Sequence, residues 1–322
     1  MEKGEERGGQ EKSGLVLLKS LFCGGMAGMA SKSFVAPLDR VKILLQTQNS
    51  AYKNKGVVSA LGLVLRREGL VGLYRGNGVQ MLRVFPYGAI QFGTFEILKR
   101  FFIQNPTNPP GSEKSSNLIR QIDKDRASVF LAGSIGGVCG VTATFPLDTI
   151  RARLAYHTKS EAGYSGMRDT FTTILKQDGV KGFYRGLIPT VVAICPQSGF
   201  SFFFFDVVKN GLIERFPLFR SRTGTDRYDL SIPGKLLAGG SSGAMAQTLT
   251  YPLDVTRRKM QLGQGKGVWQ VLVHTYTTDG VVKGLYRGMS VNYLRGVPLS
   301  AISFCTYECL KQLLGISASV KL

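Results

Sequence analysis

The chain has 322 residues, with 41 Lys and Arg against 21 Asp and Glu, so its formal net charge is +20. Two histidines are too few for a histidine-based metal or catalytic centre. The sequence also shows no nucleophile–base pair and no metal-ligand cluster, so we expect no metal, no cofactor and no enzyme activity. The bases are spread through every polar connection rather than gathered in one domain, which disfavours nucleic acid as a partner. Anionic lipid and an anionic solute remain as explanations of the charge.

The first segment, residues 1–14, is polar and has no apolar core followed by a small-residue cleavage site. We therefore expect a polar tail there and no secretory signal.

Three similar units follow this tail, and each contains Pro-Leu-Asp with a base three residues after the Asp. The copies are Pro37-Leu38-Asp39 with Lys42, Pro146-Leu147-Asp148 with Arg151, and Pro252-Leu253-Asp254 with Arg257. Further along each unit come an acid before Gly (Glu68, Asp178, Asp279) and then Tyr-Arg-Gly. We predict one unit written three times, at residues 15–105, 126–215 and 232–316, with linkers at 106–125 and 216–231.

Long uncharged segments within these units predict membrane helices. Residues 127–147, 187–205 and 236–253 contain no charge, and a bilayer requires about 17 to 25 apolar residues per helix. Two such helices per unit give six, so the predicted fold is an all-α membrane protein of three tandem two-helix repeats. A soluble helical repeat is disfavoured, because it would have to bury six long apolar segments in short units. The third unit has one extra residue near Val282, which we place in a connection.

Glycines spaced four residues apart occur in the first helix of each unit, and we expect close helix packing there. The pairs are Gly24 with Gly28, Gly136 with Gly140, and Gly239 with Gly243.

Acids and bases at membrane depth are costly unless they face a polar interior and pair. The acid of each Pro-Leu-Asp can pair with the base on its own helix or with the base of a neighbouring helix. The same choice applies to a second set, for which snorkelling of the side chains to the membrane interface is a further alternative. This set is Glu96, Lys99, Asp206, Lys209, Glu308 and Lys311.

With these motifs in all three units, the chain resembles the mitochondrial carrier family from Leu15 to Leu314. The resemblance implies a monomeric, six-helix, pseudo-threefold bundle with short matrix helices, in the inner mitochondrial membrane, working by alternating access. It implies a matrix gate with the pairs Asp39–Arg151, Asp148–Arg257 and Asp254–Lys42. It implies a cytoplasmic gate with the pairs Glu96–Lys209, Asp206–Lys311 and Glu308–Lys99. Gln46 and Gln261 would brace the matrix gate, while the second repeat has Ala155 at that position.

A solute is not threefold symmetric, so its site should lie where equivalent positions differ. One such set is Arg83, Ala193 and Arg295, and another is Lys32, Val141 and Gln247. Neither arginine has an acid at helical spacing, so we expect both to be unpaired charges that bind an anion. The resemblance implies that Lys32, Arg83 and Arg295 contact phosphates and that Ala193 with Ile194 accommodates an adenine ring. A simple packing role for Ala193 and Ile194 is the alternative.

Several stretches, including residues 35–42, 83–92 and 254–262, are similar to the coenzyme A carrier group of this family. The resemblance implies an antiporter of coenzyme A or dephospho-coenzyme A, exchanged for adenine nucleotides. An ADP/ATP or other adenine-nucleotide exchanger is the first alternative. A membrane receptor or scaffold without transport is the second, and the intact acid and base sets disfavour it.

The Tyr-Arg-Gly turns are expected to end at backbone amides that hold lipid phosphate, which in this family belongs to cardiolipin. A plain turn is the alternative. The residues are Tyr74, Arg75, Gly76, Tyr184, Arg185, Gly186, Tyr286, Arg287 and Gly288.

Overall fold

The computed structural model describes residues 2–49, 52, 55–103, 115–157, 164–216, 231–265 and 267–314. These residues form helices and short connections without any β-strand, which confirms the all-α class. The expected linkers at 106–125 and 216–231 fall partly on residues 104–114 and 217–230, outside the described residues.

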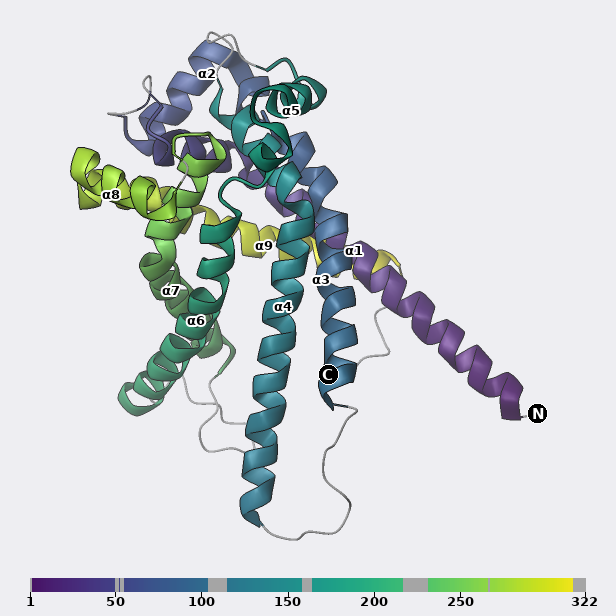
Figure 1. Ribbon diagram of the computed structural model, residues 1–322. Helices are drawn as coiled ribbons and strands as arrows, with labels where there is room; N and C mark the ends of the chain where they lie inside the picture. The colour runs from purple at the N-terminus through teal and green to yellow at the C-terminus, as the bar shows by residue number, and fades with distance from the viewer. Residues whose placement is uncertain are drawn as a thin grey trace.

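Within the described residues, each repeat consists of a long helix, a short helix and a second long helix (Figure 1). The long helices are α1 (Glu2–Gln46), α3 (Asn77–Ile103), α4 (Ser115–Tyr156), α6 (Leu187–Arg215), α7 (Ile232–Gln261) and α9 (Met289–Leu313). The short helices are α2 (Val57–Leu73), α5 (Met167–Phe183) and α8 (Val268–Asp279). Even α9, with 25 residues, is long enough to cross a hydrocarbon core of about 30 Å.

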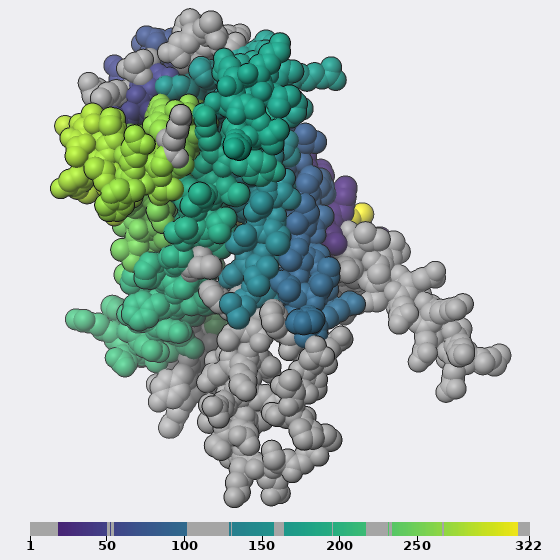
Figure 2. All heavy atoms as spheres, in the orientation of Figure 1, coloured from purple at the N-terminus to yellow at the C-terminus, as the bar shows by residue number. Residues whose placement is uncertain are grey.

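Neighbouring repeats pack through their long helices. The second long helix of each repeat lies against the first long helix of the next, as α3 on α4 and α6 on α7, and α9 returns to α1. Figure 2 shows the α3–α4 contact on the surface of the molecule. The three repeats therefore close into a ring, with α2, α5 and α8 gathered toward one end (Figure 1).

The glycine pairs do not share one role. A Cβ on Gly136 would come within 2.9 Å of the Gln91 carbonyl oxygen, so the backbones of α4 and α3 are close, as expected. Other members of the set have no atom within 4 Å of an added Cβ, namely Gly24, Gly239 and Gly243. The expectation was therefore wrong for the third repeat. Gly136 lies three residues nearer to its helix proline than Gly239 does, so the two glycines stand almost one turn apart along their helices and not at equivalent positions.

The extra residue of the third repeat does not enlarge a connection, so that expectation was wrong. After Gly280, whose φ is 75°, residues Val281–Leu285 form a single π-helical turn, labelled η2. A π turn holds one more residue than an α turn along the same path, so the helix absorbs the insertion. The carbonyl of Lys283 in this turn accepts a hydrogen bond of 3.1 Å from Gln48 Nε2, just after α1.

Large apolar side chains cover much of the outer surface. Phe202, Phe203 and Val297 are 64%, 62% and 77% exposed, which is typical of helices that face lipid rather than water. By length and composition, the stretch Met167–Arg215, which includes α6, could span a membrane unaided. The long helices α1, α4 and α7 contain the Pro-Leu-Asp motifs.

Candidate solute site and its ion-pair rings

The three Pro-Leu-Asp motifs meet through α1, α4 and α7. Arg151 Nη2 lies 2.6 Å from Asp39 Oδ2, and Arg257 Nη2 lies 2.6 Å from Asp148 Oδ2. Lys42 Nζ lies 3.5 Å from Asp254 Oδ2. The acids therefore pair with bases of neighbouring helices, not of their own, in the combinations expected of a matrix gate. We call this set the Pro-Leu-Asp ring: Asp39, Lys42, Asp148, Arg151, Asp254 and Arg257.

The arginines on α3 and α9 also reach this ring. Arg83 Nη1 lies 2.7 Å from Asp148 Oδ1, and Arg295 Nη1 lies 2.5 Å from Asp39 Oδ1. The expectation that Arg83 and Arg295 are unpaired charges was therefore wrong, because their acids lie on the adjacent helices α4 and α1 and not along α3 and α9. In both Asp148 and Asp39, Oδ2 contacts an arginine of the ring, and Oδ1 contacts Arg83 or Arg295.

The third acid has a different environment. Ala193 occupies on α6 the position that Arg83 and Arg295 occupy on α3 and α9, so Asp254 receives no guanidinium from that helix. Gln247 Nε2 instead donates to Asp254 Oδ2 at 3.2 Å. The side chain of Asp254 is 30% exposed, whereas that of Asp148 is 1% exposed. The ring is thus threefold in its backbone and asymmetric in its charges.

Two polar residues of this site were missed from the sequence. Arg258 Nη1 donates to Asp148 Oδ2 at 3.1 Å, and Asn292 Oδ1 accepts from Lys42 Nζ at 2.9 Å and from Arg295 Nε at 3.0 Å. Arg258 had a detectable signal, since the equivalent positions of the other repeats hold the apolar residues Ile43 and Ala152. Asn292 had only a weak signal, because it lies one helical turn before Arg295.

The two glutamines expected as braces differ. Gln261 Nε2 donates to Asp148 Oδ2 at 2.8 Å and thus touches the Pro-Leu-Asp ring. Gln46 Nε2 donates instead to the hydroxyl of Tyr251 at 3.1 Å, and that hydroxyl donates to the Arg287 carbonyl at 2.9 Å. A direct brace by Gln46 on the Lys42–Asp254 pair is therefore not formed in this conformation.

Lys32, Ala193 and Ile194 complete the expected solute site. Lys32 is half-buried on α1 and makes no hydrogen bond or ion pair to any described residue, so its charge is available. Ala193 is buried and Ile194 is half-buried on α6.

The acid before each Gly pairs with a base of the first long helix in its own repeat. Arg40 Nη2 lies 2.9 Å from Glu68 Oε2, Arg153 Nη2 lies 2.6 Å from Asp178 Oδ2, and Lys259 Nζ lies 3.6 Å from Asp279 Oδ2. These pairs fasten α2, α5 and α8 to the helices that carry the Pro-Leu-Asp ring.

Two of these bases also reach the next repeat. Arg40 Nε donates to the carbonyl of Ala155, and Arg153 Nε donates to the carbonyl of Gln261, both at 3.2 Å. Removal from water by itself raises the pKa of Asp178, but the hydrogen bond and charge of Arg153, with Arg185 at 2.6 Å, hold that pKa below its ordinary value.

The second ring is not formed across helices. In the described structure, all six of its side chains are present, yet the expected pairs Glu96–Lys209, Asp206–Lys311 and Glu308–Lys99 are absent. Glu96 pairs with Arg100 of its own helix at 3.4 Å, and Lys311 lies 3.9 Å from Glu308. The side chains of Glu96 and Glu308 are 55% and 38% exposed. Within the described residues, interhelical ion pairs are therefore formed at the Pro-Leu-Asp ring and not at the opposite end.

Each Tyr-Arg-Gly turn lies against the backbone of the next repeat. Gly76, Gly186 and Gly288 have φ of 85°, 89° and 83°. A Cβ on Gly76 would lie 3.1 Å from the carbonyl oxygen of Arg151, and one on Gly186 would lie 2.9 Å from that of Arg257. Glycine is required both for the left-handed conformation and for this close approach.

We predict that Gly186→Ala lowers the free energy of unfolding by about 2 kcal/mol, because it adds backbone strain and a clash. Gly199→Ala is the matched control: Gly199 lies within α6, the helix that Gly186 precedes, and an added Cβ there has no atom within 4 Å. Thermal unfolding in detergent measures the difference. Equal melting temperatures for the two variants would contradict the prediction.

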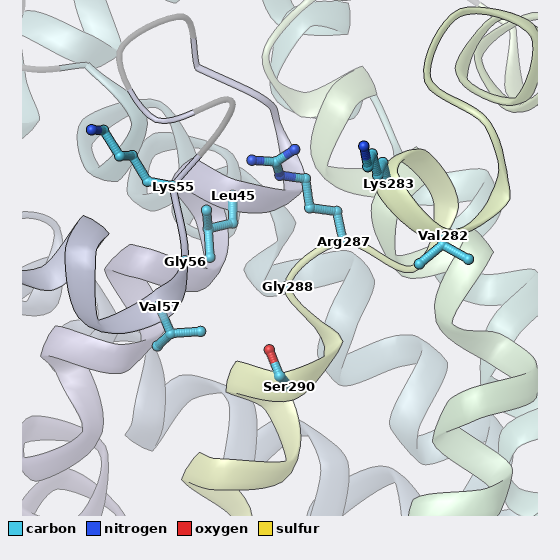
Figure 3. Close-up of a pocket in the computed structure, with 9 residues that line it drawn as sticks. All are labelled: Leu45, Lys55, Gly56, Val57, Val282, Lys283, Arg287, Gly288 and Ser290. Carbon is cyan, nitrogen blue, oxygen red and sulfur yellow. The ribbon is translucent and has the colours of Figure 1, made fainter.

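A pocket of about 520 Å³ lies beside the third turn, between the start of α9 and the start of α2 (Figure 3). It is lined by three bases, Lys55, Lys283 and Arg287, together with Ser290. Arg287 Nη2 also donates to the Tyr52 carbonyl at 3.2 Å, so this arginine has a structural contact as well. The pocket has the charge and the helix N-terminus that an anionic group requires.

Three long-short-long repeats, closed around inter-repeat ion pairs, define a carrier-type membrane transport protein. The family described as "Mitochondrial carrier protein" matches residues 13–106, 124–216 and 228–317. The chain belongs to this family and is a multi-pass transporter of the mitochondrial inner membrane rather than an enzyme.

Individual relatives cover most of the chain. "Solute carrier family 25 member 16" of Homo sapiens, the Graves disease carrier, is 44% identical over 306 residues, which are 92% of this chain and 88% of the relative. "Mitochondrial carrier protein CoAc2" of Zea mays is 35% identical over 313 residues, covering 91% and 86%. "Mitochondrial carrier protein CoAc1" of Arabidopsis thaliana is 33% identical over 322 residues, covering 92% and 89%. The expected resemblance is confirmed.

Proposed function

We propose that this carrier exchanges coenzyme A or dephospho-coenzyme A for adenine nucleotides. The observation that carries the proposal is the asymmetry of the site: guanidiniums on α3 and α9, a free lysine on α1, and Ala193 with Ile194 on α6. Three cationic groups beside an apolar patch suit a polyphosphate attached to a flat base. The names of the maize and Arabidopsis relatives, CoAc2 and CoAc1, favour coenzyme A within this class.

In the proposed mechanism, the substrate competes with the ring for Arg83 and Arg295. A phosphate that takes these guanidiniums leaves Asp148 and Asp39 with fewer partners, which weakens the Pro-Leu-Asp ring. The free energy of substrate binding offsets this loss, because the substrate favours the state in which the ring opens. The six acids and bases at the other end then form the cytoplasmic gate as the matrix gate opens.

We further propose that Ala193 and Ile194 contact the adenine ring, that Gln46 and Gln261 stabilise the closed matrix gate, and that the protein works as a monomer. The three Tyr-Arg-Gly turns would hold cardiolipin phosphate. The bases and the helix N-terminus of the pocket beside Arg287 support the lipid site.

Uptake into proteoliposomes tests the function. We expect labelled coenzyme A and dephospho-coenzyme A to enter vesicles loaded with ADP, and to enter vesicles loaded with sulfate far more slowly. Uptake of ADP without uptake of either coenzyme A form would favour the adenine-nucleotide exchanger instead. Failure of all three compounds would contradict both transport proposals and favour a receptor or scaffold.

A further inference from the structure

One hydrogen-bonded chain on α6 and α7 ends at the gate residue Asp254, but its two glutamines have no part in the proposed gate pairs or phosphate contacts. Gln197 Nε2 donates to Gln247 Oε1 at 3.1 Å, and Gln247 Nε2 donates to Asp254 Oδ2 at 3.2 Å. Gln197 is exposed and Gln247 is half-buried. Both stand where the three repeats differ: the counterparts of Gln197 are Tyr87 and Leu299, and those of Gln247 are Lys32 and Val141.

The carboxylate at the end of this chain fixes the direction of every hydrogen bond in it. An ionised carboxylate only accepts hydrogen bonds, so Gln247 must turn its Nε2 toward Asp254 and its Oε1 away. That oxygen can only accept, so Gln197 must in turn direct Nε2 toward it. Gln197 is left with Oε1 as an acceptor and one remaining Nε2–H as a donor, in a fixed arrangement.

The position of this amide matches the proposed base site. Gln197 follows Ala193 by one helical turn on α6, so the two residues share a face of the helix. Gln247 on α7 is equivalent to Lys32 on α1, since each lies five residues before the proline of its Pro-Leu-Asp motif. The amide therefore lies beside the apolar patch, and the three proposed phosphate ligands lie on α1, α3 and α9.

We propose that Gln197 reads the edge of the adenine base, with Gln247 as the positioning residue that prevents its amide from turning over. This inference rests on the proposed function and adds a specificity determinant to it. Adenine offers a 6-amino donor next to a ring-nitrogen acceptor, which suits the acceptor and donor that Gln197 presents. Hypoxanthine offers the opposite arrangement, a 6-oxo acceptor next to an N1–H donor, and would require a reversed amide.

The experiment compares ADP with IDP, which differ only in the base, as competitors for uptake of labelled coenzyme A in proteoliposomes. In the unmodified protein we expect ADP to compete about tenfold better than IDP. Gln197→Met should bring that ratio close to one. Gln247→Leu should do the same while uptake continues, because a free Gln197 can turn over to match either base. A purely structural role of Gln247 would not change the ratio.

Tyr293→Phe is the matched control, since it removes the hydroxyl of another exposed contact to α7, the 2.5 Å contact of Tyr293 with Thr248. This variant should show the same ADP-to-IDP competition ratio as the unmodified protein. A ratio that stays the same in Gln197→Met, or that favours neither nucleotide in the unmodified protein, would overturn the inference while leaving the proposed function intact. A loss of coenzyme A uptake without a change in the ADP-to-IDP ratio would assign Gln197 to the pantetheine arm instead. No uptake of any adenine compound would remove the proposed function and the inference with it.

Discussion

Arg295→Ala and Arg83→Ala are both expected to reduce uptake by about 10- to 100-fold, through the loss of a charge-assisted contact to substrate phosphate. Their effects on stability should differ, because the two arginines leave their acids in different surroundings. Without Arg83, Asp148 keeps Arg257, Arg258 and Gln261. Without Arg295, Asp39 keeps Arg151 as its ion-pair partner in the described structure.

The thermal stability of the detergent-solubilised variants measures this difference. Arg295→Ala should cost about 2 kcal/mol, and Arg83→Ala less than about 1 kcal/mol. Conservative replacement by lysine should restore part of the stability in Arg295→Lys but little of the uptake, since an ammonium lacks the forked donors. Two alanine variants that lost uptake but kept the same melting temperature would contradict the unequal sharing of the acids.

Asp148→Asn is expected to have the largest effect on stability of any single change in the site. Three guanidiniums, those of Arg83, Arg257 and Arg258, converge on this carboxylate, whose side chain is 1% exposed. A neutral amide would leave them facing one another without compensation, which costs about 3–5 kcal/mol when a buried partner is removed.

Asp254→Asn is the matched control in the third repeat. Among the described residues, Asp254 has one ion-pair partner, Lys42 at 3.5 Å, and its side chain is 30% exposed, so the same change should cost about 1 kcal/mol or less. Chemical or thermal unfolding of both variants gives the comparison. Equal losses would mean that the ring shares its charge evenly, contrary to the structure.

The all-α fold could be predicted because its signals are local and repeated. Uncharged segments, prolines and acid-Gly motifs keep the same order in each unit, so each copy predicts two long helices and three copies predict six. The short helices between them were implied by the family resemblance. The interpretation of the Pro-Leu-Asp acids needed the family resemblance, since spacing alone left pairing within one helix open.

The partners of Arg83 and Arg295 could not be predicted from spacing, because spacing identifies neighbours only along one helix. Asp148 and Asp39 become neighbours when α4 packs on α3 and α1 on α9, and both contacts lie between repeats. The state of the second ring was unpredictable for another reason. A carrier sequence encodes two conformations of similar free energy, and Glu96 or Lys311 can take part in only one set of contacts at a time.

The π turn at Val281–Leu285 has a consequence for how the chain becomes a ring. We call each contact between two repeats a seam. The α3–α4 and α6–α7 seams join repeats that are consecutive in the polypeptide, so the connecting segment already holds their surfaces near each other. The seam between α9 and α1 joins the two ends of the sequence, and the entropy of closing that long loop must be offset by contacts alone. The inserted residue lies at this seam, and its turn offers the Lys283 carbonyl to Gln48. The π turn thus supplies a hydrogen bond at the seam where the backbone provides no connection.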